Sequence, residues 1–459
     1  MIVAADLKTV GAHRLSTEKA VAARFDHSVA VALITLGCAK NEADSAQMRA
    51  LLESGGYRVV DEIDDASIVI VNTCGFITEA TEESLECIFD VVREWLPGAD
   101  RRHVVVAGCM ASRYGSDLAA ELGEVSLFLG VADEERLLQL LEPLSGVKAT
   151  NNAVVRKATR PSEHVKIADG CDRQCSYCTI PAIRGPYRSR PIPEIRREVE
   201  SLVESGAREI VLVAQDTSCY GRDLADGTSL VSLLDEICGL EDLAWVRVMY
   251  LQPDGIDEAL LDCFARNESI CRYFEMPMQH SCARIVRDMG RSGEGKTFLD
   301  LVETIRRRFS EAVIRTTLIA GYPSETEEEF GALVDFLGDV RFDYVGVFPY
   351  SPEDGTKAAL HDGQIDEVER VRRANVLREH AEAIAFEKVG CYVGRTLDVL
   401  VESRDKEGVV FGRHRGQAPD IDGAVMIRGW GESSLESGMI IPIRVDDAIL
   451  YDLEGECAT

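Results

Sequence analysis

Apolar runs and helical segments alternate along residues 30 to 145. The apolar runs occupy residues 31–37, 67–73 and 103–108, and each is followed by a segment whose apolar residues recur at helical spacing. Alternating elements of this length predict a mostly parallel, doubly wound sheet with helices on both faces.

The alternation continues from about residue 160 to 360. Six apolar runs are expected as strands, at residues 164–168, 209–215, 245–251, 272–278, 313–321 and 344–350. Helical patterns lie between them, for example at 193–203 and 325–337, and the latter opens with Thr326 and Glu329 in capping-box spacing. Six such units predict a full or partial barrel of the TIM type, whose chemistry lies at the carboxyl ends of its strands.

A third pattern follows a long charged helix expected at residues 365–389. Short apolar runs at 395–403, 408–414, 423–429 and 438–455 are separated by glycines and charged residues, which predicts a small all-β barrel. The expected organisation is an unassigned extension (1–27), an N-terminal domain (28–147), a central domain (158–388) and a C-terminal barrel (389–456).

Charge and composition narrow the class of protein. The 459 residues carry a net charge of −29, and residues 390–459 alone hold seven basic and thirteen acidic side chains. Such a field repels phosphate backbones and attracts basic partners. No run of eighteen apolar residues or secretory signal pattern is present, so we expect a cytoplasmic protein with no membrane-spanning segment.

Three cysteines lie close together in GCDRQCSYC: Cys171, Cys175 and Cys178. The run follows the first expected strand of the central domain, at the catalytic edge of the barrel. Three thiolates on an iron–sulfur cube leave one iron open, and an open metal position is typical of a site that binds substrate. The alternative is a zinc knuckle completed by His164 or His280.

Three further cysteines each follow one strand of the N-terminal domain: Cys38, Cys74 and Cys109. Because the ends of parallel strands meet at one edge of a sheet, these thiols are expected to converge there. The alternative is that they are small buried residues at strand ends. We interpret the other eight of the fourteen cysteines as incidental or core thiols.

The CxxxCxxC spacing after a barrel strand resembles the signature of the radical S-adenosylmethionine (SAM) enzymes. That resemblance implies a 4Fe–4S cluster whose open iron chelates SAM and whose electron cleaves it to a 5′-deoxyadenosyl radical. With the upstream cysteines and the terminal barrel, the order from about residue 30 to 455 resembles the methylthiotransferases. It implies an auxiliary-cluster domain with a second 4Fe–4S cluster on Cys38, Cys74 and Cys109, a radical SAM core and a TRAM domain.

Several stretches favour the RimO-type branch of that family, namely NTCGFI, KIADGCDRQCSYCTIPAIRGPYRSR, QDTSCYG, PMQHSCARIVRDMGR and VGVFPYSPEDGT. The resemblance implies methylthiolation of an aspartate in the twelfth protein of the small ribosomal subunit, a basic partner that suits an acidic enzyme. It also implies a sulfur donor and a low-potential electron donor such as flavodoxin or ferredoxin. The alternatives are a tRNA methylthiotransferase (MiaB-type) and a non-enzymatic zinc-bound ribosome or RNA adaptor.

The chain departs from the family pattern at four places, none of them a cluster ligand: Ala39, Ala46, Ala320 and Ser324. Further candidates at the predicted catalytic edge are Tyr177, Gln215, Asp216, Arg315, Gly321 and Pro323 for SAM, and Gln279, His280 and Arg291 for substrate or proton transfer. Each has a structural alternative: packing for the tyrosine, turn formation for the four loop residues 215, 216, 321 and 323, a structural role for the histidine, and salt bridges for the arginines.

Overall fold

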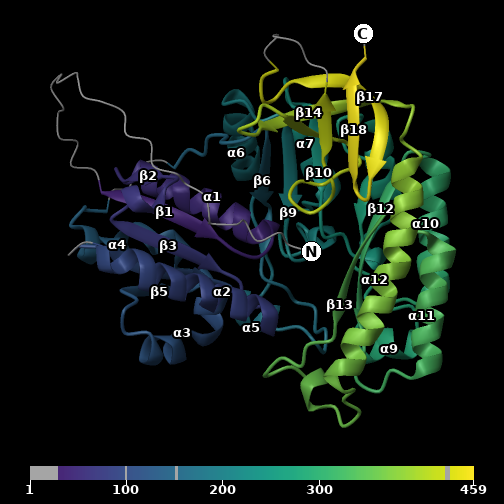
Figure 1. The fold of residues 1–459 in the computed structure, drawn as a ribbon, viewed down its shortest axis with the longest axis horizontal. Coiled ribbons are helices and arrows are strands. Elements are labelled where there is room, and N and C mark those ends of the chain that lie inside the picture. Colours follow the sequence, from purple (N-terminus) through teal and green to yellow (C-terminus); the bar gives the residue numbers. More distant parts are fainter. Residues whose placement is uncertain (1–28, 99–100, 150–153, 429–434, 459) are drawn as a thin grey trace.

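The computed structural model describes residues 29–98, 101–149, 154–428 and 435–458 (Figure 1). The expected extension at residues 1–27 lies outside these ranges. The described chain forms an N-terminal α/β domain, a central partial barrel of parallel strands with helices outside it, and a small C-terminal β-barrel, as predicted. In Figure 1 the N-terminal domain lies to the left of the central strands and the barrel lies above them.

The N-terminal domain holds a five-stranded parallel sheet in the order β2-β1-β3-β4-β5. Its strands are β1 (Ala30–Thr35), β2 (Arg58–Val60), β3 (Ile68–Thr73), β4 (His103–Gly108) and β5 (Leu127–Leu129). The three predicted strands are the inner ones, where burial on both faces demands continuous apolar runs. Sequence reasoning missed β2 and β5, because edge strands of three residues leave almost no pattern.

Helices cover both faces of this sheet. They are α1 (Ala39–Ser54) and α4 (Leu137–Ser145) on one face, and α2 (Thr78–Asp90), its π-helical continuation η2 (Val91–Trp95) and α3 (Cys109–Glu121) on the other. Short 3-10 turns complete the domain at η1 (Ile63–Asp65), η3 (Leu96–Gly98) and η4 (Val131–Arg136). The doubly wound prediction is therefore confirmed.

The central domain holds six parallel strands in two sheets, ordered β10-β9-β6 and β11-β12-β13. They are β6 (Ser162–Lys166), β9 (Glu209–Val213), β10 (Trp245–Val248), β11 (Tyr273–Glu275), β12 (Val313–Ala320) and β13 (Tyr344–Pro349). A bridge between Val246 and Ile270 links the two sheets. Because β6 and β13 do not pair, the barrel is partial, one of the two forms expected.

Six helices pack outside these strands and enclose the largest hydrophobic cluster. They are α6 (Ile192–Glu204), α7 (Leu230–Ile237), α8 (Glu258–Arg266), α10 (Gly295–Arg308), α11 (Glu327–Val340) and α12 (Glu367–Gly390). Smaller elements lie in the loops: α5 (Ile180–Arg184), α9 (Ala283–Asp288), η5 (Thr217–Cys219), η6 (Pro253–Gly255) and η7 (Ala358–Leu360). The predicted capping box of Thr326 and Glu329 opens α11.

The C-terminal segment closes into a five-stranded barrel in the order β14-β15-β16-β18-β17. Its strands are β14 (Thr396–Arg404), β15 (Val410–His414), β16 (Val425–Arg428), β17 (Ile440–Ile449) and β18 (Asp452–Cys457). The apolar run expected as one strand at 438–455 is two, because the chain reverses at Leu450, whose φ is 57°. Among the described residues, none of the helices has the length and apolar character needed to cross a membrane.

Candidate functional site

The loop that carries Cys171, Cys175 and Cys178 is held at its base by a small antiparallel ribbon. Strand β7 (Ala168–Asp169), just after β6, pairs with β8 (Arg188–Ser189), so both ends of the loop leave the barrel edge together. Inside the loop the Cys171 N–H donates to Gly185 O (3.1 Å) and the Cys178 N–H donates to Cys175 O (3.1 Å). These local bonds shape the loop that carries the three thiols.

A cavity of about 530 Å³ opens at these cysteines and is bounded on the other side by residues 355–357. Burial raises the pKa of the Cys178 thiol to about 12 and also raises that of Cys171. Arg291 reaches the loop, where its Nη1 lies 3.8 Å from Cys175 Sγ. Arg291 therefore lies beside the thiolates that a cluster needs, as well as donating to Pro277 O (2.6 Å).

The second triad is built on the strand order of the N-terminal sheet. Strands β1 and β3 are adjacent while α1 and α2 leave them toward opposite faces, which makes the crevice at which open α/β sheets bind ligands. Cys38 and Cys74 follow these two strands, and Cys109 follows β4. Cys74 and Cys109 are buried, and burial together with the neighbouring Cys38 raises the pKa of Cys74 to about 12. The predicted convergence at one sheet edge is what the strand order produces.

Polar side chains hold the backbone of this crevice. Asn41 Nδ2 donates to Leu36 O (2.7 Å) and Thr73 O (3.0 Å), which ties the loops after β1 and β3 together. The Ser84 hydroxyl accepts from the Cys74 N–H (3.1 Å) and donates to Cys74 O (2.9 Å). Because both loops are pinned by side-chain bonds, the cysteines at their ends keep fixed relative positions.

The two triads face the same domain interface. The Thr179 hydroxyl, one residue after Cys178, donates to Phe76 O (3.2 Å), two residues after Cys74. Arg184, at the end of α5, donates to Asn41 Oδ1 (3.1 Å) and pairs with Asp44 (2.8 Å). The Arg184 and Asp44 side chains are 1% and 0% exposed, so this ion pair is buried. It joins α5, which follows Cys178, to α1, which follows Cys38.

Each donor set consists of three cysteines, the ligand type that iron–sulfur cubes use. No group of three His, Cys, Asp or Glu side chains in the described part of the chain is close enough to hold one ion. A cube differs because each thiolate binds its own iron, so the sulfurs stand further apart. The two histidines of the zinc alternative are engaged elsewhere: His164 Nδ1 contacts Arg160 (3.0 Å) and His280 Nδ1 accepts from the Cys282 N–H (2.9 Å).

Two of the predicted SAM contacts lie together after β9. Both side-chain polar atoms of Gln215 are buried with no hydrogen-bond partner among the described residues, as expected of a group that awaits a ligand. Asp216 is instead occupied, because Arg173 Nε (2.5 Å) and the Cys219 thiol (3.1 Å) both donate to its Oδ2. Through Arg173, a residue of GCDRQCSYC itself, Asp216 braces the cluster loop. Direct contact with SAM stays a prediction for both residues.

Tyr177 lies in the loop between Cys175 and Cys178 and packs against a group of buried apolar residues that includes Met289 and Tyr322. Burial raises the pKa of its phenol well above the usual range, so the ring stays neutral. This packing is the structural alternative considered for Tyr177, and a contact with adenine stays a prediction.

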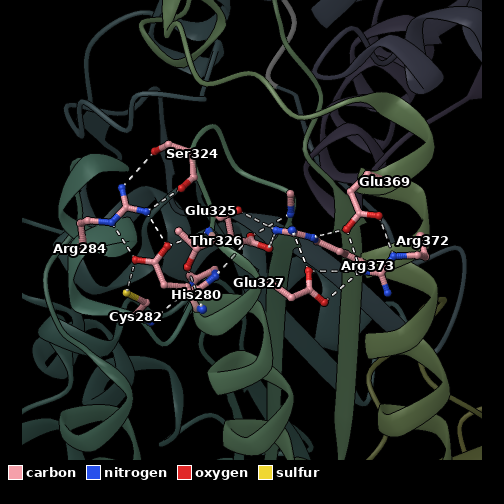
Figure 2. A network of polar contacts seen from close by, with 12 residues as sticks. His280, Cys282, Arg284, Ser324, Glu325, Thr326, Glu327, Glu369, Arg372 and Arg373 are labelled. Atoms are coloured by element: carbon pink, nitrogen blue, oxygen red, sulfur yellow. Dashed lines mark hydrogen bonds and ion pairs between the residues drawn. The ribbon is translucent and has the colours of Figure 1, made fainter.

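The loop after β12 carries Gly321 and Pro323 and is fixed by a polar network (Figure 2). The Gly321 N–H donates to Glu325 Oε2 (2.9 Å), and Glu325 pairs with Arg373 of α12 (2.8 Å). His280 Nε2 lies 3.4 Å from the same carboxylate, and both side chains are fully buried. His280 Nε2 makes no hydrogen bond in the described part of the chain, so a role in substrate binding or proton transfer stays a prediction beside the structural one.

Ser324 stands where the family pattern has a glycine, and its backbone takes a conformation that glycine favours. Its φ is 62°, in the left-handed region that favours glycine. Arg284 compensates for this, because it donates to Ser324 Oγ (3.1 Å) and to Ser324 O (2.9 Å), as Figure 2 shows. The loop therefore keeps the glycine-type turn with a serine.

Gln279 and Arg315, the two remaining candidates, differ in whether their side chains have partners. Gln279 has a φ of 71°, and its buried Oε1 has no partner in the described part of the chain, so it could still receive a ligand. Arg315 pairs with Asp422 of the C-terminal barrel (2.7 Å), which is the salt-bridge alternative. Sequence reasoning missed Arg173 and Arg184, although Arg173 lies inside the loop between Cys171 and Cys175.

Comparison with known proteins agrees with this architecture. Residues 30–130 match the Uncharacterized protein family UPF0004, residues 165–337 the Radical SAM superfamily and residues 393–458 the TRAM domain. The chain is 41% identical, over 93% of its length and 98% of the relative, to "Ribosomal protein uS12 methylthiotransferase RimO" of Syntrophus aciditrophicus. It is 40% identical to the protein of the same name from Syntrophotalea carbinolica, over 93% and 96%.

A solved structure shares the fold. The radical SAM methyltransferase TsrM from Kitasatospora setae superposes with a TM-score of 0.53 at 17% identity, covering 78% of this chain and 89% of that one. At this identity the likeness supports the fold class alone.

Proposed function

Because this chain belongs to the RimO family of radical SAM methylthiotransferases, we propose that it attaches a methylthio group to an aspartate β-carbon of ribosomal protein uS12. The observation that carries this proposal is that two cysteine triads face one domain interface. Contacts of Thr179 and Arg184 join them across it. If one centre generates a radical on a substrate carbon and the other supplies the sulfur for it, both must reach the same carbon, and the shared interface would allow this.

The six cysteines are proposed as the cluster ligands. Cys171, Cys175 and Cys178 would hold the cluster that binds SAM, and the remaining three would hold the auxiliary cluster: Cys38, Cys74 and Cys109. When bound, the clusters and SAM supply the electron, the radical that removes a hydrogen atom from the β-carbon, the sulfur and the methyl group. The chain itself orients these groups and excludes water from between them.

The charge of the chain favours the ribosomal protein over tRNA. A net charge of −29 attracts a basic protein and repels a polyphosphate at long range. The barrel strands add no basic surplus that would hold RNA. We infer that the reaction takes place in the cytoplasm, where ribosomal proteins are found, and that a low-potential flavodoxin or ferredoxin and a separate sulfur donor serve it.

To test the proposal, the protein is reconstituted anaerobically and incubated with SAM, sulfide and a reductant. Purified uS12 and unmodified tRNA are added together as possible substrates. Mass spectrometry then locates any methylthio group. We expect the mass gain on one aspartate of uS12. A gain on tRNA alone would contradict the substrate, and no gain on either, from protein that contains zinc, would contradict the activity.

Two variants separate the clusters. Cys171→Ala should lose 5′-deoxyadenosine formation and keep about half of the bound iron. Cys74→Ala should also keep about half of the iron but retain SAM cleavage while losing methylthio transfer. Cys391→Ala is the matched control, because this exposed thiol lies far from both triads in sequence and should change neither readout.

A further inference from the structure

Lys40 reaches from one domain into the other. It lies in the first turn of α1, two residues after Cys38, and its Nζ stands 3.3 Å from the centroid of the Tyr250 ring. Tyr250 follows β10, at the carboxyl edge of the central strands where the chemistry of such barrels takes place. The ammonium group therefore lies between the auxiliary cysteines and the mouth of the barrel.

The platform beneath Lys40 is rigid. Tyr250 has a φ of 59°, a left-handed conformation that is costly for an aromatic residue and marks sites where geometry matters. Its N–H donates to Glu275 Oε2 (2.9 Å), which is buried. An ammonium group on an aromatic face still has N–H donors that point away from the ring and can meet another acceptor.

Lys40 differs from several neighbouring cations of this interface because its ammonium group has no carboxylate in contact among the described residues. Within the described ranges, no carboxylate lies within 4.0 Å of its Nζ. Four other cations of the interface each have carboxylate partners: Arg184 with Asp44 and Asp169, Lys166 with Asp44, Glu134 and Asp169, Arg173 with Asp216 and Asp254, and Arg315 with Asp422. Arg291 lies at the other triad, beside Cys175.

A half-buried ammonium group with no carboxylate in contact is costly unless a ligand supplies the anion. In the reaction proposed above, the target side chain brings one, because the β-carbon of an aspartate is bonded directly to its carboxylate. A cation beside the auxiliary triad can hold that carboxylate and so aim the neighbouring β-carbon at the transferred sulfur.

We propose that Lys40 Nζ binds the carboxylate of the target aspartate and thereby selects aspartate as the substrate side chain. This inference rests on the proposed function. The Tyr250 ring supports the ammonium group from the opposite side, so Lys40 is a substrate-binding residue and Tyr250 a positioning residue.

The test measures the affinity of anaerobic holoenzyme for uS12 and for a uS12 variant whose modified aspartate is asparagine. Wild-type enzyme should bind the aspartate form about 10- to 100-fold more tightly, as expected when one charge-assisted hydrogen bond is lost. Lys40→Met should bind both forms with nearly equal affinity, and Lys40→Arg should retain part of the preference. Lys296→Met is the control, because Lys296 is exposed and paired with Asp300 on α10.

The iron content of Lys40→Met, and its 5′-deoxyadenosine formation without uS12, should match wild type. Loss of iron in Lys40→Met would show that the residue serves the auxiliary cluster and would overturn the proposal. An unchanged preference for aspartate in Lys40→Met would overturn it as well. If wild-type enzyme neither binds nor modifies uS12, the proposed function fails instead, and the two failures are thereby distinguished.

Discussion

His414, the last residue of β15, lies where the C-terminal barrel meets the central domain. Its ring lies tilted against that of Tyr392, with the centroids 4.8 Å apart, and its Nδ1 accepts from the Gly416 N–H (3.0 Å). Burial, with the charges of Arg247 and Arg413, lowers the pKa of this imidazole to about 3. His164 on β6 is similarly buried, and its pKa is also lowered to about 3. Single buried histidines thus make the fold sensitive to acid.

We predict that His414 contributes to loss of stability between pH 7 and pH 5. Its pKa is lower in the folded state than in the unfolded one, near 6.5, so between these values only the unfolded chain binds the proton. Stability then falls as pH falls, by about 2 kcal/mol from this residue between pH 7 and pH 5. Urea unfolding of wild type and His414→Gln at both values would show a smaller pH effect in the variant.

His361→Gln is the matched control, because His361 is exposed in the loop before α12. An equal pH effect in His414→Gln and wild type would contradict the assignment.

At the scale of elements, the junction of β4 and α3 decides where Cys109 lies. The helix begins directly after the strand, and Gly108 makes the turn with a φ of 92°. A Cβ at Gly108 would stand 2.7 Å from Thr73 O and would also collide with Asn72 Oδ1. Only glycine allows β3 and β4 to approach this closely while the chain turns into the helix. The backbone of the auxiliary crevice therefore depends on this residue.

Gly108→Ala should lower the free energy of unfolding by about 2–4 kcal/mol, because it adds both backbone strain and a steric clash. It should also lower bound iron by about half, since Cys109 would move. Iron analysis and urea unfolding are the measurements.

Gly115→Ala tests whether the position or the residue type matters. Gly115 lies within α3, and a Cβ added there would meet nothing within 4 Å, so alanine should raise stability by up to about 1 kcal/mol. Similar behaviour of the two variants would contradict the argument.

At the scale of the whole molecule, buried charges join the three domains. Glu209 on β9 accepts from Arg247 (2.7 Å) and from Arg413 of the C-terminal barrel (2.5 Å), and it is fully buried. Burial alone would raise its pKa, but the two guanidinium groups hold the pKa at about 2. On the other side, Arg184 and Asp44 join the N-terminal domain. Buried ion pairs between residues far apart in the sequence therefore join the three domains to one another.

Glu209→Gln should destabilise the protein by about 3–5 kcal/mol, because two buried guanidinium groups lose their shared negative charge. The loss should loosen the barrel first, so limited proteolysis should release the C-terminal segment faster than in wild type. Glu236→Gln removes an exposed partner of Arg196 and should change stability by less than about 1 kcal/mol. Equal proteolysis of both variants would contradict this role.

The sequence by itself determined the parts of this protein that depend on local pattern. The spacing of Cys171, Cys175 and Cys178 indicated an open cluster, and the apolar runs predicted the inner strands and all three domain types. Such features follow from the periods of strands and helices and from ligand spacing within one loop. The short strands β2 and β5 escaped because three residues at a sheet edge carry no period.

Only the tertiary structure decided which side chains surround the cysteines. Arg184 pairs with Asp44, 140 residues away in the sequence, and Arg315 pairs with Asp422. The Lys40 ammonium group lies on the ring of Tyr250, which belongs to another domain. No periodicity links such partners, because their contact depends on strand order and domain packing rather than on neighbouring sequence. Local pattern thus determined the chemistry that the chain can carry, and long-range packing decided where its two triads meet.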